Sequence, residues 1–169
     1  FSHEACLALR PWDEAVAFET FDQALDALRA GDCGCALIPV ENSTIGVVEP
    51  AATLVGALGV EPVAQVWRPI RHALMAIDGA RLSDIRTVES HPIALAQCKD
   101  TLAGLNVEVV EHFDTAGAAR DVAEAGDPTR AAIAPIGAAE VYGLSILRND
   151  LQDSGDNQTR FVLLSFPEG

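Results

Sequence analysis

The segment Asn157-Gln158-Thr159-Arg160-Phe161-Val162-Leu163-Leu164 combines polar chemistry with an apolar run near the C-terminal end of the chain. Its first half carries a hydroxyl, a guanidinium and an aromatic ring on consecutive residues, and its second half is typical of a buried strand. In a regular strand Thr159 and Phe161 face one side and Arg160 the other. A terminal strand often forms a sheet edge, but this polar content favours a functional strand.

The length and composition indicate a globular protein. A chain of 169 residues can form one compact unit with a sizeable core or two small lobes. Hydrophobic residues make up 49% and charged residues 21%. Neither an apolar run of about 18 residues nor a basic-then-apolar leader occurs, so we predict a soluble, cytoplasmic protein without a membrane span or signal peptide. Because the first residue is Phe1 rather than Met, we expect the sequence to be part of a longer chain.

The charge balance bounds the possible ligands. The net charge is −14, and Lys99 is the one lysine of the sequence. This balance argues against nucleic acid as a partner, since no basic cluster is present. An anionic ligand would need a local positive pocket made from a few arginines, backbone N–H groups and helix N-termini. Any arginine that faces a cleft is therefore informative.

The cysteines and histidines indicate no metal site. Cys6, Cys33, Cys35 and Cys98 show no zinc-type spacing with the scattered histidines. Free cysteine is among the most frequently buried residue types, so we interpret all four as buried reduced thiols. We expect neither a metal nor a cofactor.

Strand and helix patterns alternate along the chain. The alternation predicts an α/β fold with mainly parallel sheets and helices on both faces. Expected helices cover residues 2–10 (capped by Ser2), 21–30 (ended by Gly31), 90–102, 114–122 and 135–142; expected strands cover 15–18, 36–40, 63–67, 70–77, 87–89, 107–110, 131–134, 144–147 and 158–164. Pro69 interrupts a long extended stretch and marks a natural crossing between lobes. We therefore expect residues 1–69 and 151–169 in a first lobe and 70–150 in a second.

A polar cluster, residues 41–46, follows the strand predicted at 36–40. It contains Glu41, Asn42, Ser43 and Thr44. In open α/β sheets, ligands bind at the carboxyl ends of strands, where these hydroxyl and amide groups could hold a carboxylate. The alternative is an ordinary loop in which Asn42 satisfies backbone groups.

The second half of the chain offers fewer polar candidates. Ser90 and Gln97 are seven residues apart and, on one helix, would share a face about 10 Å apart, which suits two ends of a small substrate. Alternatively, Ser90 is only an N-cap and Gln97 is solvated. Asp114-Thr115 is a pocket wall or a helix cap. Strand alternation turns Arg71 and His72 to opposite faces, and a surface or core-edge position is our default for both.

Six motifs, in order across almost the whole chain, resemble the catalytic domain of the prephenate dehydratase family. They are Phe1-Ser2-His3-Glu4-Ala5, Pro39-Val40-Glu41-Asn42-Ser43 with Gly46, Ile70-Arg71-His72-Ala73-Leu74, Ser90-His91-Pro92 with Gln97-Cys98, Thr115-Ala116 before Ala118-Ala119, and Asn157-Gln158-Thr159-Arg160-Phe161. Family members also have a strand before the first motif and commonly a C-terminal ACT domain that binds phenylalanine. Neither element lies within these residues.

The resemblance implies a two-lobed fold like that of type 2 periplasmic binding proteins, with the active site in the cleft between the lobes. It implies decarboxylative dehydration of prephenate to phenylpyruvate, water and carbon dioxide in phenylalanine biosynthesis. A homodimer or higher homo-oligomer is expected. The alternatives are an arogenate dehydratase, a prephenate decarboxylase relative, or a binding module for dicarboxylates without chemistry.

The resemblance also assigns roles to residues. Thr159 would donate a hydrogen bond or relay a proton to the leaving hydroxyl. We do not expect it to act as a general acid, because a threonine hydroxyl is a poor acid. Arg160 either forms a structural ion pair or reaches the ligand, and Phe161 packs or contacts the ring. Glu41 would repel a dianion, so we prefer for it a structural bond to backbone N–H groups.

The remaining candidates are expected to close on the substrate as hydrogen-bond donors when the lobes come together. They are Asn42, Ser43 and Thr44 in the first lobe, with Ser90 and Gln97 in the second. Thr115 is a further candidate contact.

Overall fold

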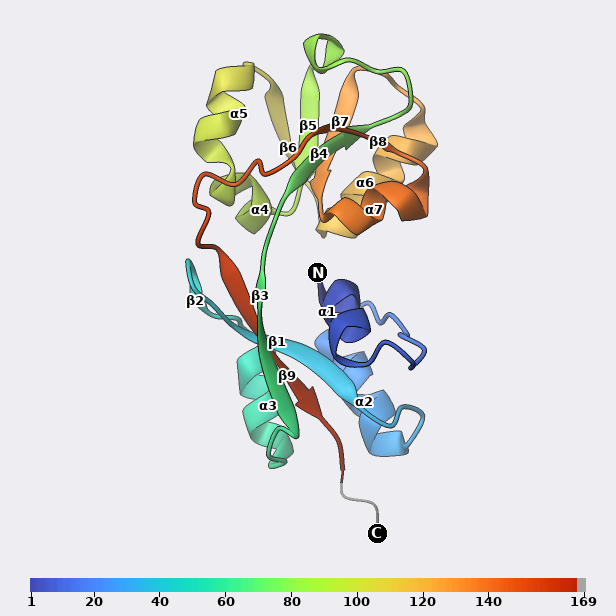
Figure 1. The fold of residues 1–169 in the computed structure, drawn as a ribbon, viewed down its shortest axis with the longest axis vertical. Helices are drawn as coiled ribbons and strands as arrows, with labels where there is room; N and C mark the ends of the chain where they lie inside the picture. Colours follow the sequence, from blue (N-terminus) through green and yellow to red (C-terminus); the bar gives the residue numbers. More distant parts are fainter. Residues whose placement is uncertain (167–169) are drawn as a thin grey trace. The chain divides into compact units, whose positions relative to one another are not determined.

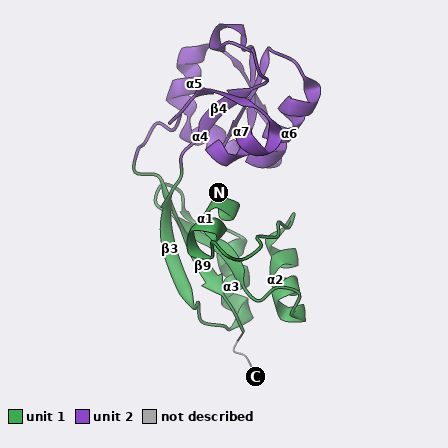
Figure 2. Ribbon diagram, turned by 45° about the vertical axis from the view of Figure 1, so that its right-hand side comes forward, with its two compact units in different colours: residues 1–70, 156–169 green, residues 71–155 purple. Residues whose placement is uncertain are grey.

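The computed structural model describes residues 1–166, and the chain divides into two compact units (Figure 2). Unit 1 holds residues 1–70 and the C-terminal segment from Asp156, and unit 2 holds residues 71–155. The sequence-based prediction divides the lobes after residues 69 and 150. None of the helices in the described part of the chain has the length and apolar content that crossing a bilayer requires.

Unit 1 is built on an antiparallel sheet with the strand order β2-β1-β9-β3 (Figure 1). The last strand of the chain, β9, lies between β1 and β3 and is therefore central, as its polar and apolar content indicates. The elements of this unit are α1 (Ser2–Leu9), α2 (Phe21–Ala30), β1 (Ala36–Asn42), β2 (Gly46–Val47), α3 (Ala51–Leu58), β3 (Ala64–Pro69) and β9 (Gln158–Leu164).

Helices α2 and α3 pack on one face of this sheet. Helix α2 begins with a capping box, in which Thr20 Oγ1 accepts from Gln23 N and the Gln23 side chain accepts from Thr20 N. It ends at Gly31, whose φ of 79° lies in the left-handed region that glycine tolerates. The helix predicted over 21–30 is confirmed. The buried cluster on this face contains Leu25, Leu28, Ala36, Ile38, Val40, Ala51, Val162 and Leu164.

Unit 2 is a mixed sheet with the order β6-β5-β7-β4-β8. Strand β5 runs parallel to β6 and β7, and β4 runs antiparallel to β7 and β8. The elements of this unit are β4 (Ala73–Ala76), the 3₁₀ turn η1 (Leu82–Asp84), β5 (Thr87–Ser90), α4 (Pro92–Gln97), α5 (Lys99–Leu105), β6 (Glu108–Glu111), α6 (Thr115–Ala125), β7 (Arg130–Ala134), α7 (Ile136–Tyr142) and β8 (Ser145–Arg148).

Helices cover both faces of the unit 2 sheet, as predicted (Figure 1). Residues from α4 and α5 share one buried cluster with alternate strand residues such as Leu74 and Ile133. Residues from α6 and α7 share the other with the intervening strand residues, such as Met75 and Ala132. Successive residues of β4 and β7 belong to the two clusters in turn, because successive side chains of a strand point to opposite faces.

Several expectations about the fold are wrong. Ala15–Phe18 forms no strand within residues 1–166, and its Val16 and Phe18 side chains are exposed. Ser2 does not cap α1, because the N-cap position is Phe1 and no side-chain cap bond is present there. The sheets are not mainly parallel. Among the described strands only the β5–β6 and β5–β7 pairs are parallel, and β9 and β4 each run antiparallel to both of their neighbours.

Replacing Phe161 tests the role of this ring in the core. Phe161 is 1% exposed and lies opposite Pro39 and Val66 in the sheet. We expect Phe161→Ala to lower the free energy of unfolding by about 3–5 kcal/mol, because it leaves a cavity in the central strand. Urea unfolding measures the loss. The control Phe113→Ala, at a ring that is 75% exposed, should change it by less than about 0.5 kcal/mol; equal losses would contradict a packing role.

Candidate active site

A β-bulge in β1 turns Asn42 toward Thr159. The pairing of β1 with β9 shifts between Pro39 and Glu41, and beyond the shift Asn42 lies opposite Thr159. Side chains opposite each other on paired strands share a face. Regular alternation from Ile38 would instead have turned Asn42 toward the face that α2 and α3 cover. The bulge therefore re-aims this side chain.

Two backbone N–H groups set the orientation of the Asn42 amide. Asn42 Oδ1 accepts hydrogen bonds from the N–H groups of Thr44 (2.9 Å) and Ile45 (3.1 Å). The amide nitrogen must then face the other way, where Nδ2 donates to Asn157 Oδ1 at 2.8 Å and to Thr159 Oγ1 at 2.9 Å. The loop interpretation of Asn42 is confirmed, because its oxygen bonds the loop backbone, and contact with a ligand stays a prediction. We call Asn42, Asn157 and Thr159 the first polar cluster.

Two donors of this cluster remain available. Thr159 Oγ1 accepts from Asn42, so its own O–H hydrogen is free to point elsewhere, and it donates to no described residue. Asn157 is 2% exposed, and its Nδ2 has no hydrogen-bond partner among residues 1–166. An unsatisfied buried donor costs about 1–3 kcal/mol. Such a pair of donors fits a ligand that brings oxygen acceptors.

Ser43 ties the loop after β1 to the start of β9. Its Oγ donates to the carbonyl oxygen of Asp156 at 2.8 Å and accepts from the N–H of Gln158 at 2.9 Å. Its own N–H donates to the Gln158 carbonyl at 2.8 Å. The hydroxyl hydrogen of Ser43 is thus committed within the protein. Thr44 is exposed, and its backbone N–H is the group that bonds Asn42.

Arg160 and Glu41 lie on the opposite face of the sheet from Thr159. The Nε and Nη2 atoms of Arg160 lie 3.0 and 2.9 Å from Glu41 Oε2, and Nη1 donates to Gln65 Oε1 at 3.1 Å. The guanidinium also stands 6.0 Å from the centre of the Trp67 ring. Of the two expected orientations of Arg160, the structure has the ion pair. The preferred interpretation of Glu41 is wrong, since its partner is this guanidinium.

Gln97 forms a second polar cluster, in unit 2. His72 Nε2 donates to Gln97 Oε1 at 2.8 Å, and the backbone N–H of His72 donates to Gln152 Oε1 at 2.9 Å. His72 is 2% exposed, and this burial lowers its pKa, so the ring is neutral at pH 7. Because Oε1 is occupied, Gln97 presents its Nε2 as a donor, which bonds no other described residue. Gln97 is therefore not simply solvated.

Ser90 is committed inside unit 2. It is fully buried, and its Oγ donates to the carbonyl oxygen of Ile133 at 2.6 Å. It is not the N-cap of α4, because that position is His91, whose Nδ1 accepts from the N–H of Ile93. The helix expected through residue 102 is interrupted at Cys98. As a donor to substrate, Ser90 would first have to release Ile133.

Thr115 is the first residue of α6 and is half-buried. The cap of this helix is Asp114, whose Oδ1 accepts from the N–H of Gly117, so the cap interpretation of this pair is confirmed. The structure leaves the substrate contacts expected of Thr115, Arg160 and Phe161 as predictions.

The sequence patterns indicate no role for Asn157, and the surface or core-edge position expected for His72 is wrong, because its side chain is buried. The position of Asn157, two residues before Thr159, could have shown that the two share a face in an extended chain. His72 meets Gln97 only through the fold of unit 2, so no local pattern signals the pair. Among the described residues, no group of histidine, cysteine or carboxylate side chains has the arrangement of a metal site.

A comparison with protein families matches residues 1–168 to the model described as prephenate dehydratase. The chain belongs to the prephenate dehydratase family. A curated relative, arogenate dehydratase/prephenate dehydratase 2 of Arabidopsis thaliana, is 40% identical over 165 residues, which are 98% of this chain and 43% of the relative. The chain thus spans less than half of that protein.

Two solved structures share the fold. The prephenate dehydratase of Arthrobacter aurescens in complex with L-Phe has a TM-score of 0.86 and 32% identity, covering 99% of this chain and 57% of that one. The structure of GqqA, described as a novel type of quorum quenching acylase, has a TM-score of 0.90 and 35% identity, covering 99% and 61%. The expected two-unit α/β fold is therefore confirmed.

Reversing the Asn42 amide tests the polarity of the first cluster. In Asn42→Asp an acceptor replaces Nδ2, so the Thr159 hydroxyl would turn to donate to it and be lost to the substrate. We expect turnover to fall by roughly 100-fold or more while the circular dichroism spectrum is retained. The same change at the exposed Asn149 should leave turnover unaltered. Full activity of Asn42→Asp would contradict the hydrogen-bond directions assigned here.

The neutral, buried His72 makes stability depend on pH. Its folded pKa lies below the unfolded value of 6.5, so the unfolded state binds the proton first as pH falls. The free energy of unfolding should therefore decrease as pH drops below about 6.5. His72→Gln should flatten this slope, and His3→Gln, at an exposed histidine, should not. Urea unfolding between pH 7.5 and about 5 measures both; equal slopes in the two variants would exclude His72 as the source.

Proposed function

We propose that this chain catalyses the decarboxylative dehydration of prephenate to phenylpyruvate in phenylalanine biosynthesis. The observation that carries the proposal is the Thr159 hydroxyl, which is 7% exposed, accepts from Asn42 and keeps its hydrogen available. Family membership and the identity to an arogenate/prephenate dehydratase support the same reaction.

The reaction makes definite demands on the protein. The bond from the ring to its carboxylate breaks, carbon dioxide leaves, and the electron pair enters the ring as the bond to the hydroxyl breaks at the opposite carbon. The hydroxyl takes up one proton and departs as water, and the ring becomes aromatic. The protein must anchor the retained carboxylate and donate to the departing oxygen, where negative charge develops.

Thr159 meets the second demand as a positioned donor. Asn42 Nδ2 donates to Thr159 Oγ1, and hydrogen bonds in a chain polarise one another, so this bond strengthens Thr159 as a donor in turn. Burial adds to the effect, because the bond forms in a medium of low dielectric constant. Asn157 Nδ2 is a second donor at the same cluster for an oxygen of the substrate.

The geometry favours dehydration over acyl transfer. Acyl transfer is the chemistry of an acylase, the type of enzyme that GqqA is described to be. A threonine nucleophile needs a general base that accepts its proton. The partner of Thr159 is instead an amide nitrogen, and within residues 1–166 no histidine, lysine or carboxylate hydrogen-bonds its hydroxyl. An arogenate dehydratase, a decarboxylase relative and a dicarboxylate-binding module remain the competing hypotheses. A cytoplasmic location and a homo-oligomer stay predictions; the Arabidopsis relative is described as chloroplastic.

Thr159 variants test the proposal. Thr159→Val keeps the shape and removes the donor, so kcat for prephenate should fall by roughly 100- to 1000-fold. Thr159→Ser keeps the O–H group and should retain far more activity. Absorbance of phenylpyruvate measures turnover, and disappearance of prephenate without aromatic product would indicate a decarboxylase. Near wild-type turnover by Thr159→Val would show that this hydroxyl is not the donor.

A further inference from the structure

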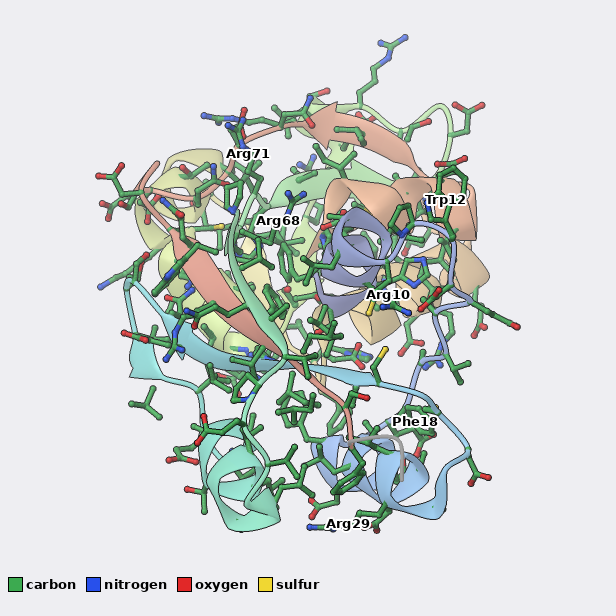
Figure 3. The ribbon with its side chains drawn as sticks, turned by 60° about the horizontal axis from the view of Figure 1, so that its bottom comes forward. Arg10, Trp12, Phe18, Arg29, Arg68 and Arg71 are labelled. Atoms are coloured by element: carbon green, nitrogen blue, oxygen red, sulfur yellow. The ribbon has the colours of Figure 1, made fainter. Side chains whose placement is uncertain are left out.

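Arg68 lies beside Thr159 on the same face of the unit 1 sheet. In the pairing of β3 with β9, Arg68 is opposite Thr159, and Trp67 is opposite Arg160. Opposite residues of antiparallel strands have their Cβ atoms about 4.5–5.5 Å apart on one face. Figure 3 labels Arg68 along β3, where its side chain lies on the side of that strand toward α1. Asn42, Thr159 and Arg68 therefore form one row across three adjacent strands.

Among the half-buried arginines of residues 1–166, which are Arg68, Arg130 and Arg160, only Arg68 has no hydrogen-bond or ion-pair partner. It is half-buried, and it makes no hydrogen bond or ion pair to a described residue. Arg86 donates to backbone carbonyls, and Arg81 and Arg148 are exposed in unit 2. The arginines in ion pairs are Arg10, Arg29, Arg71, Arg120, Arg130 and Arg160.

Arg68 is an unpaired, half-buried guanidinium in a chain whose net charge is −14. Burial of a charge is costly unless a counter-ion meets it, and a planar guanidinium matches a carboxylate with two parallel hydrogen bonds. The Thr159 hydroxyl lies in the same row as Arg68, and Asn157, whose Nδ2 has no partner among residues 1–166, precedes β9 and bonds Asn42 of that row. These three donors together favour an anionic oxygen ligand.

We propose that Arg68 binds the carboxylate of the 2-oxo acid side chain and so selects prephenate over arogenate. This inference rests on the proposed function. Prephenate has two carboxylates, and the one on the ring loses its charge as carbon dioxide departs. A cation there would stabilise the substrate more than the transition state and slow the reaction. The side-chain carboxylate keeps its charge throughout, so a guanidinium can hold it without this penalty.

The side chain also separates the two candidate substrates. Next to its carboxylate, prephenate carries a neutral keto oxygen, whereas arogenate carries an ammonium group. A guanidinium attracts the negatively charged 2-oxo acid group but repels the ammonium of the zwitterion. Arg68 is therefore a specificity-determining residue that favours the 2-oxo acid.

Steady-state kinetics of Arg68→Leu with both substrates test this assignment. Because the carboxylate is held equally in the ground and transition states, KM for prephenate should rise by about 10- to 100-fold with kcat little changed. The kcat/KM for arogenate should change by less than about 3-fold, since it gains little from the charge. Arg68→Lys should restore part of the preference. Arg148→Leu, which removes the same charge at an exposed site, should leave all constants unchanged.

Inhibition by products gives a second reading, measured on the turnover of prephenate by the wild-type protein and by the variant. Phenylpyruvate should inhibit the wild-type enzyme more strongly than L-phenylalanine does at this site, and Arg68→Leu should remove the difference. An unchanged substrate preference in Arg68→Leu, a fall in kcat instead of a rise in KM, or a wild-type preference for arogenate would each overturn the role of Arg68. Failure of the wild-type protein to convert either substrate would instead overturn the proposed function.

Discussion

The site in unit 1 depends on the orientation of one side-chain amide. The N–H groups of Thr44 and Ile45 hold Asn42 Oδ1, and this leaves Nδ2 to face Asn157 and Thr159. Every subsequent bond direction follows, because an N–H can only donate and the oxygen that it meets must accept. A loop bond that looks purely structural thus determines that the Thr159 oxygen accepts from Asn42 and that its hydrogen is left to donate to another group. The backbone N–H groups two and three residues after Asn42 therefore determine the direction of the hydrogen bond at the Thr159 hydroxyl.

The fold places this amide through two departures from regularity. Strand β9 comes last in the chain but lies between β1 and β3, so residues from three strands form one row across the sheet. The shift in register between Pro39 and Glu41 then turns Asn42 onto the Thr159 side. The same alternation sends Arg160 to the other face, where Glu41 neutralises it, and leaves Arg68 on the side of the site. Strand alternation and the register shift in β1 together place Arg160 with Glu41 on one face and Arg68 with Thr159 on the other.

Much of the fold follows from local patterns, and much of the site does not. The spacing of apolar residues and the end at Gly31 predict α2 correctly, and the family motifs contain Asn42, Thr159 and Gln97. The strand expected at 15–18 fails because apolar composition cannot supply a pairing partner. The role of Arg68 lay outside sequence reasoning, since it depends on register with a strand some 90 residues later. Bulges and long-range register are set by tertiary packing, which local propensity does not encode.

A crystal structure with a prephenate analogue that cannot aromatise, but keeps the ring hydroxyl and both carboxylates, tests the central claim most directly. We predict the ring hydroxyl oxygen within about 3 Å of Thr159 Oγ1, with the hydrogen bond from Asn42 Nδ2 to Thr159 Oγ1 intact. We also predict the side-chain carboxylate on the Arg68 guanidinium. An analogue whose hydroxyl lies away from Thr159, or an Asn42 amide turned so that its oxygen faces Thr159, would contradict the claim.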